Sequence, residues 1–117
     1  MSKWKKSSEE LKEKFISTLL KYSGVDHKKM FGYPCCFLRG NMFTGLHEEN
    51  WVLRLSENDR ELMTSKYEAS IFAPMKGRVM KEYRIVPLSI LDSEKLLNEW
   101  INRSIQYVTT LPEKVKK

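Results

Sequence analysis

Three short segments of strand-like composition follow one another in the first half of the chain, and they constrain the fold more than any other feature. They are residues 35–38, 42–46 and 51–55. The turn Arg39-Gly40-Asn41 separates the first two, and Gly40 and Asn41 are typical of the two central positions of a tight hairpin. A polar turn at residues 48–50 precedes the third. The pattern predicts a three-stranded antiparallel meander.

Helical segments flank this meander. Ser8 is a candidate cap for a helix that Gly24 ends, and its apolar residues recur at spacings of three and four: Leu11, Phe15, Ile16, Leu19 and Leu20. Ser56, with Asp59 three residues later, resembles a capping box and predicts a short helix to about Lys66. A last helix is expected from Asp92 or Ser93 to Leu111-Pro112, with Trp100 in its apolar stripe and Trp51 in the core pattern of the third strand.

The segment 68–78 holds Pro74 and Gly77 and is expected to be irregular. Residues 79–86 alternate as a strand does, with a short partner strand near Ile71 and Phe72. The order is therefore helix, three strands, helix, strands, helix. This order predicts an α+β fold in which a two-layer arrangement packs an antiparallel sheet against helices.

The length of 117 residues fits one domain, which we place at residues 8–112 between a basic leader, 1–7, and a basic tail, 113–117. No apolar run approaches the roughly 20 residues that cross a bilayer. We therefore expect a cytoplasmic protein with no membrane contact. Cys35 and Cys36 are adjacent, which disfavours a disulfide between them.

The net charge is +6, and it is unevenly distributed. Residues 1–30 carry +4 (eight bases, four acids), residues 31–75 carry −2 (four bases, six acids), and residues 76–117 carry +4 (nine bases, five acids). Excess positive charge at both ends permits attraction to phosphates without requiring it.

Metal and catalytic chemistry find little support in the sequence. His27, Cys35, Cys36 and His47 lack the spacings of zinc ligands, and in a strand the two cysteines would face opposite sides of the sheet, as half-buried small hydrophobes. No G-x-S-x-G elbow is present, although a reactive Cys36 beside Lys28 or Lys29 is an alternative. We expect no metal, no cofactor and no enzymatic activity.

The most suggestive charged cluster is Lys76-Gly77-Arg78, followed by Lys81 and Arg84. A glycine lets backbone N–H groups approach an anion, and the flanking cations supply charge. In a regular strand Arg78 and Arg84 would share one face and Lys81 would lie on the other. The cluster favours either a phosphate or nucleic-acid site, or an exposed strand whose charges discourage aggregation.

Several short motifs, in order, resemble the TfoX N-terminal domain family over residues 8–112. They are Met30-Phe31-Gly32, residues 36–43, Trp51 to Ser56, Phe72 to Arg78, Tyr83 to Pro87, Leu96 to Trp100 and Ser104 to Val108. The resemblance implies a two-layer α+β fold like that of secretion chaperones. It offers no catalytic residues to carry over. The family is named for regulators of DNA uptake competence that carry a second, C-terminal domain, for which 117 residues leave no room.

We therefore expect a non-enzymatic regulatory or binding module whose partner is a protein or a nucleic acid. One alternative is a homodimeric adaptor that exposes Phe37, Phe43 or Trp51 at its contact. Another is an anion-binding enzyme that uses the strand from Lys76 to Arg84 as a phosphate grip.

Overall fold

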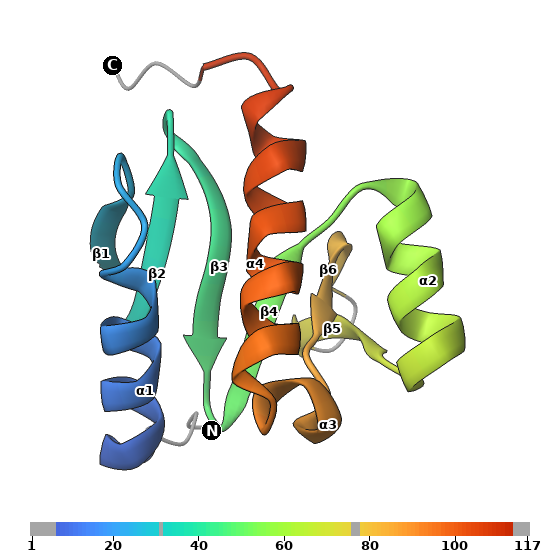
Figure 1. Cartoon of the computed structure of the whole chain (residues 1–117), viewed down its shortest axis with the longest axis horizontal. Coiled ribbons are helices and arrows are strands. Elements are labelled where there is room, and N and C mark those ends of the chain that lie inside the picture. Colours follow the sequence, from blue (N-terminus) through green and yellow to red (C-terminus); the bar gives the residue numbers. More distant parts are fainter. Residues whose placement is uncertain (1–6, 31, 76–77, 114–117) are drawn as a thin grey trace.

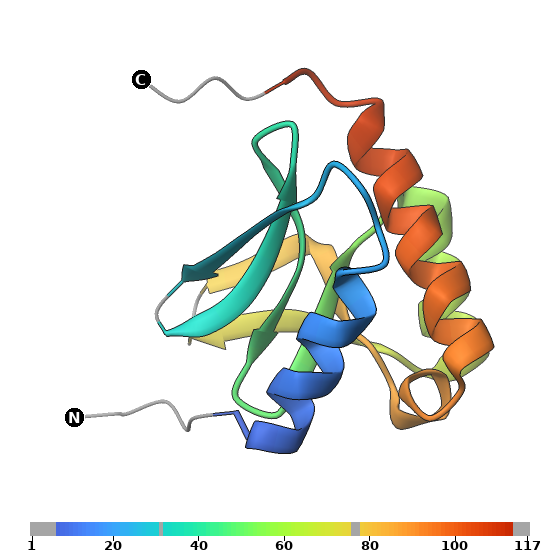
Figure 2. The same ribbon diagram turned by 60° about the vertical axis from the view of Figure 1, so that its left-hand side comes forward.

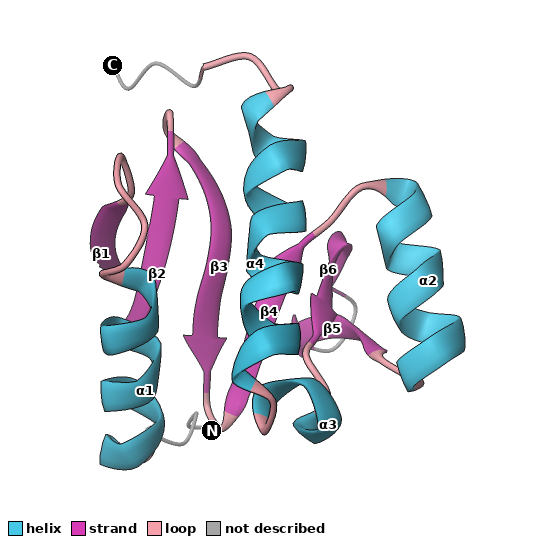
Figure 3. Ribbon diagram, in the orientation of Figure 1, coloured by secondary structure: helices cyan, strands magenta, loops and turns pink. Residues whose placement is uncertain are grey.

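The computed structural model describes residues 7–30, 32–75 and 78–113. It contains a six-stranded sheet, with helices on one face, as the secondary-structure colouring of Figure 3 shows. The helices are α1 (Glu9–Leu19), α2 (Glu57–Tyr67), α3 (Leu88–Leu91) and α4 (Glu94–Thr109). The strands are β1 (Asp26–Met30), β2 (Tyr33–Leu38), β3 (Asn41–His47), β4 (Asn50–Arg54), β5 (Ser70–Met75) and β6 (Arg78–Ile85).

All neighbouring strands are antiparallel, in the order β1-β2-β3-β4-β6-β5. The first four strands form a meander, and the β5–β6 hairpin joins it because β6 pairs with β4 (Figure 1). The predicted α+β class and antiparallel sheet are confirmed.

Serine caps fix the starts of three helices. The hydroxyls of Ser8, Ser56 and Ser93 accept hydrogen bonds from the N–H groups three residues later, at 3.2, 3.3 and 3.3 Å. Each hydroxyl satisfies one of the N–H groups that a helix start leaves without an intrahelical partner. The predicted caps at Ser8 and Ser56 are confirmed, and Ser93 rather than Asp92 caps α4, which begins at Glu94.

The main core lies between the sheet and the helices α1 and α4, which cross the same face of the sheet (Figure 2). Phe15 of α1 contacts Trp51 of β4, with ring centroids 4.9 Å apart, and Trp100 of α4 is also buried. The predicted core positions of both tryptophans are confirmed. The buried Trp51 indole N–H donates to Thr44 Oγ1 at 2.9 Å, so its polar atom is satisfied inside this core.

A bulge in β3 sets which residues face the helices. Cys36 pairs with Thr44 and Phe37 pairs with Met42, which leaves Phe43 as an extra residue on β3. Phe43 belongs to the helix-side core and Thr44 bonds to Trp51 there. A bulge of this kind also bends a strand and increases its twist.

Ser104 fastens α4 to the middle of the sheet. Its buried hydroxyl lies 3.1 Å from the Phe43 carbonyl oxygen and 2.6 Å from the Arg54 carbonyl oxygen, and it donates toward these two acceptors. The two acceptors belong to β3 and β4, so one side chain links the helix to two neighbouring strands.

Five details of the sequence prediction are wrong. The hairpin turn has Arg39 and Gly40 in its central positions, both with positive φ, while Asn41 already pairs with Leu38. Helix α1 ends at Leu19, well before Gly24. Strand β1 and the short helix α3 were not expected, and β5 occupies most of a segment expected to be irregular. The short strand expected near Ile71 and Phe72, paired with residues 79–86, is confirmed within β5.

We predict that Ser104→Ala lowers the free energy of unfolding by roughly 1–3 kcal/mol, because the Phe43 and Arg54 carbonyls lose the one O–H donor that they share. Urea unfolding followed by tryptophan fluorescence measures the change. The matched control is Ser17→Ala on α1, where the serine is exposed and bonds only to the Lys14 carbonyl of its own helix. Equal effects of the two substitutions would contradict the role assigned to Ser104.

Candidate ligand-binding cavity

A cavity of about 270 Å³ lies on the face of the sheet opposite the main core. Cys35, Gly45 and Val52 are aligned across β2, β3 and β4, and Cys35 and Val52 both line this cavity. Because side chains alternate along a strand, their neighbours Cys36, Trp51 and Leu53 point into the helix-side core instead.

Gly45 has no side chain, so the surface of the sheet is recessed at this point. A Cβ atom there would lie 2.8 Å from the Met42 Cε atom and 3.0 Å from the Cys35 Cβ atom. The first distance is shorter than real Cβ contacts and the second is tight, so a side chain at residue 45 would have to displace the end of the Met42 side chain. Glycine therefore lets Met42 fold over β3 as part of the cavity wall.

The wall of the cavity is mainly apolar. Its apolar side chains include Met30, Phe37, Met42, Leu46, Phe72 and Met80, and its polar side chains are Asn41, His47 and Arg54, with the two tyrosines Tyr33 and Tyr83. Many apolar groups with a few polar ones are typical of a small-molecule site, and methionines adapt their shape to what they contact.

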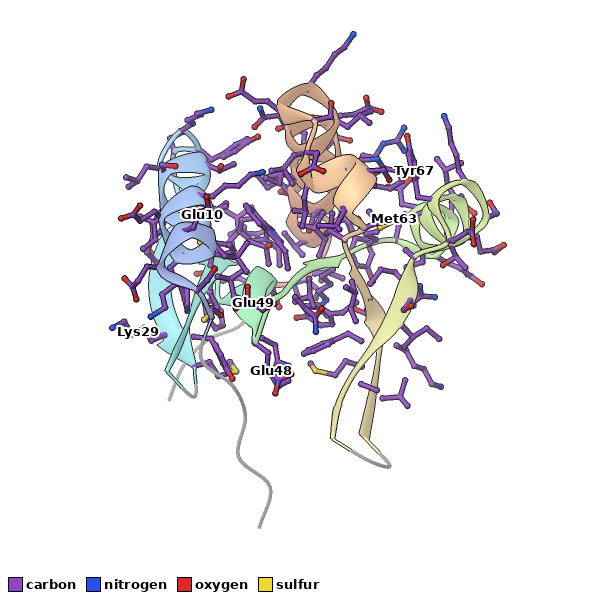
Figure 4. All side chains as sticks on the ribbon, turned by 90° about the horizontal axis from the view of Figure 1, so that it is seen from below. Glu10, Lys29, Glu48, Glu49, Met63 and Tyr67 are labelled. Atoms are coloured by element: carbon purple, nitrogen blue, oxygen red, sulfur yellow. The ribbon has the colours of Figure 1, made fainter. Side chains whose placement is uncertain are left out.

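One end of the cavity is built around His47, at the end of β3. The imidazole ring lies between the rings of Tyr33 and Phe72, with centroids 5.3 Å away on each side. Burial lowers the pKa of His47, and the neighbouring Glu48 carboxylate opposes that shift. The ring is therefore neutral at pH 7. Glu48 itself lies between the two arms of the sheet in Figure 4.

The other end is built around Arg54, the last residue of β4. Its Nε atom pairs with Glu82 Oε1 at 2.6 Å, and its guanidinium carbon lies 6.0 Å from the centroid of the Tyr83 ring. The Tyr83 hydroxyl donates to the Met42 carbonyl oxygen at 3.0 Å. Burial raises the pKa of Tyr83 to about 12, so the phenol stays protonated and keeps this bond.

A second cation lies near the Arg54 end. The Lys28 ammonium of β1 is 5.1 Å from the centroid of the Phe37 ring, and Phe37 pairs with Met42 on the cavity face. Lys28 is exposed, and no carboxylate of the described residues forms an ion pair with it.

The two cysteines face opposite sides of the sheet, as the alternation of a strand predicts. Cys36 lies in the helix-side core and Cys35 lines the cavity, and both thiols are free. They are more deeply buried than expected, at 0% and 2% exposure. Burial raises the pKa of Cys36 to about 12 and also raises that of Cys35, where Lys28 opposes the shift. This environment disfavours the reactive thiolate considered from the sequence.

The basic cluster predicted as an anion site is only partly described. Lys76 and Gly77 lie outside the described residues, as does the side chain of Arg78, so these predictions stay predictions. Lys81 is exposed. The expected alternation of faces is broken along β6, since Ile71 pairs with Arg84 but Phe72 pairs with Met80, which leaves three residues of β6 opposite no β5 residue.

Arg84 is engaged inside the protein. Its guanidinium donates to Thr64 Oγ1 of α2 at 3.1 Å and to the Lys81 carbonyl oxygen at 2.9 Å. Desolvation by burial lowers its pKa, and the neighbouring Arg60 adds to that shift. Arg84 therefore serves to hold α2 on β6, and a phosphate would have to compete with these bonds.

The predicted interaction surface needs a correction. Phe43 and Trp51 are fully buried in the helix-side core, so neither is exposed at a contact. Phe37 is half-buried and lines the cavity. The β3 bulge places Phe43 on the helix side of the sheet, and Trp51 faces the same side because it alternates with Val52 of the cavity.

Within residues 7–30, 32–75 and 78–113, no group of three or more histidine, cysteine or acidic side chains could hold a metal ion. In the same part of the chain, no helix has the length and apolar character needed to span a bilayer.

The fold and the cavity define a small α+β domain with one sheet and one layer of helices. The TfoX N-terminal domain family matches residues 17–108, so the chain belongs to this family. The match includes every residue of the cavity wall named above. No curated protein and no solved structure gives a significant match to the chain.

We predict that both thiols of the folded protein react with a disulfide reagent at pH 8 at a rate reduced by roughly 100-fold or more relative to the unfolded chain, because both are buried and their pKa values are raised. Release of the coloured thiolate measures the rate, and Cys35→Ala isolates Cys36. A thiol that reacts as fast in the folded protein as in guanidinium would contradict the described environment.

Proposed function

We propose that the protein is a non-enzymatic regulatory module that acts by binding, and that the cavity is its binding site. The observation that carries the proposal is the cavity itself, a hollow of about 270 Å³ with an apolar wall and few polar groups. A sheet face covered by no helix would be expected to turn polar side chains to water, as open antiparallel sheets commonly do.

The chemistry of the wall supports binding over catalysis. The groups that could act as bases or nucleophiles there are held in unreactive forms: the pKa values of Cys35 and Tyr83 are raised, and the Tyr83 hydroxyl donates a hydrogen bond to a backbone carbonyl. The neutral His47 ring is enclosed by two aromatic rings. General acid–base catalysis needs a group poised near the working pH and within reach of a substrate proton.

The position of the cavity supports a regulatory role. Its wall takes residues from β1, β2, β3, β4, β5 and β6, so an occupant would tie together strands that are far apart in the sheet order. A ligand that binds the folded state raises its stability and can shift a conformational equilibrium of the sheet arms. Nucleic acid is a weaker candidate partner, because the Arg84 guanidinium is already bonded within the protein.

We predict that the neutral fluorescent probe N-phenyl-1-naphthylamine binds the protein with increased emission, and that Met80→Trp weakens this binding roughly tenfold or more, because a larger side chain fills the cavity. Fluorescence titration gives the two dissociation constants.

The matched control is Val79→Trp, which adds the same ring one residue earlier on β6, at a side chain that is 54% exposed and does not line the cavity. This variant should bind the probe as the unsubstituted protein does. The proposal fails if the unsubstituted protein shows no saturable binding, or if both tryptophan variants weaken it equally.

A further inference from the structure

We propose that the natural occupant of the cavity is a small apolar carboxylic acid, held by its carboxylate at Arg54 and by its apolar body between Phe37, Phe72 and the methionines. This inference rests on the proposed function and names the chemical class of its ligand. Three features of the cavity support it.

The first feature is the incomplete use of the Arg54 guanidinium. The group carries five N–H donors, and its ion pair with Glu82 uses the Nε position. Among the described residues, Glu82 is the carboxylate that pairs with Arg54. The Arg54 side chain also forms a hydrogen bond with the Tyr83 side chain, and these two contacts use only part of the five donors. A carboxylate that reaches the remaining N–H groups would match their fork geometry. The Arg54 side chain is 21% exposed, so such a pair would be partly desolvated.

The second feature is the asymmetry of charge along the cavity. The Arg54 end also receives the Lys28 ammonium over Phe37, whereas the His47 end has the Glu48 carboxylate beside it. The two ends are separated by the length of β4, from Asn50 to Arg54, or about 13 Å at the usual rise of a strand. Glu82 and Asp26, which pairs with Phe37, offset the two cations, so the Arg54 end is close to neutral while the His47 end has an acid beside it. An anionic group is therefore repelled less at the Arg54 end, where the guanidinium can bond to it directly.

The third feature is that the polar side chains between the two ends of the cavity already have hydrogen-bond partners within the protein. The Tyr83 hydroxyl donates to the Met42 carbonyl, and the Asn41 amide donates to the Pro112 carbonyl at 3.0 Å. What faces the ligand between the two ends is ring and methionine surface, which suits a ring or a short alkyl chain. The volume of about 270 Å³ suits one compact apolar body better than a peptide segment, which would need an extended groove.

The test compares 2-naphthoate with 2-naphthamide, two probes of nearly equal shape of which only the first is charged at pH 7. Calorimetric titration should show naphthoate binding roughly tenfold or more tighter than the amide, because a charge-assisted hydrogen bond is stronger than a neutral one. Added salt should weaken naphthoate and leave the amide unchanged.

Variants locate the carboxylate. Arg54→Gln should lower the affinity for naphthoate to that for the amide. Arg54→Lys keeps the charge but loses the forked guanidinium, so its affinity for naphthoate should lie between that of the unsubstituted protein and that of Arg54→Gln. The matched control is Arg103→Gln, because Arg103 also forms a short ion pair, at 2.7 Å to Asp59, but does not line the cavity. Circular dichroism confirms that each variant is folded before its affinity is compared.

The outcomes separate this inference from the proposed function. Equal binding of the two naphthalenes, with no effect of Arg54→Gln, would overturn the carboxylate assignment while cavity binding stands. Binding of neither naphthalene, with the neutral probe still bound, would overturn it as well. If the neutral probe also fails to bind, both the inference and the proposed function are wrong.

Discussion

The bulge at Phe43 is the constraint on which the two faces of the sheet depend. It places Phe43 and Thr44, consecutive residues of one strand, among the groups of the helix-side core. The carbonyls at the bulge then accept bonds from opposite sides of the sheet: Phe43 from Ser104 of α4, and Met42 from Tyr83 of the cavity. One irregular residue thus links the docking of α4 to the construction of the cavity.

The cavity follows from an imbalance between the two faces. Helices cover one face only, as Figure 2 shows, yet β2, β3 and β4 carry apolar side chains on both. The open face buries its apolar groups by bending its two arms, β1–β2 and β5–β6, away from the helices (Figure 4). Val52, Phe72 and Tyr83 form a second small core there. This packing leaves a hollow because Gly45 contributes no side chain to it.

The parts of the fold that could be predicted from the sequence are those with a strong local signal. The serine caps, and the turns that separate the strand-like segments of β2 to β4, are such signals, and they predicted the starts of α1 and α2 and the meander correctly. Strand β1 was missed because Asp26-His27-Lys28-Lys29-Met30 is mostly polar and each of its residues is exposed, so it has no strand-like pattern without its pairing to β2. Helix α3 is a single turn, too short for periodicity.

The site was missed for a different reason. The sequence showed Phe37 and the Lys28 region only as separate features, because the pairings that join β1 to β2 and β4 to β6 are not visible in it. A usable signal did exist in the apolar residues on the second face of the sheet. Cys35 and Phe37 are two residues apart on β2 and so share this face, which Met42 and Val52 also line. A single layer of helices covers only the other face. The position of Arg54 at the cavity could not be predicted from the sequence, because its contacts with Glu82 and Tyr83 are visible only in the structure.

The most direct measurement of the central claim is an ¹H–¹⁵N correlation titration of the isotope-labelled protein with 2-naphthoate, which locates the bound molecule residue by residue. The account predicts saturable shifts at the amides of Gly40, Met42, Arg54 and Tyr83, with little change along α1 and on α2. Shifts confined to the helices, or no saturable shift at any cavity residue, would contradict it.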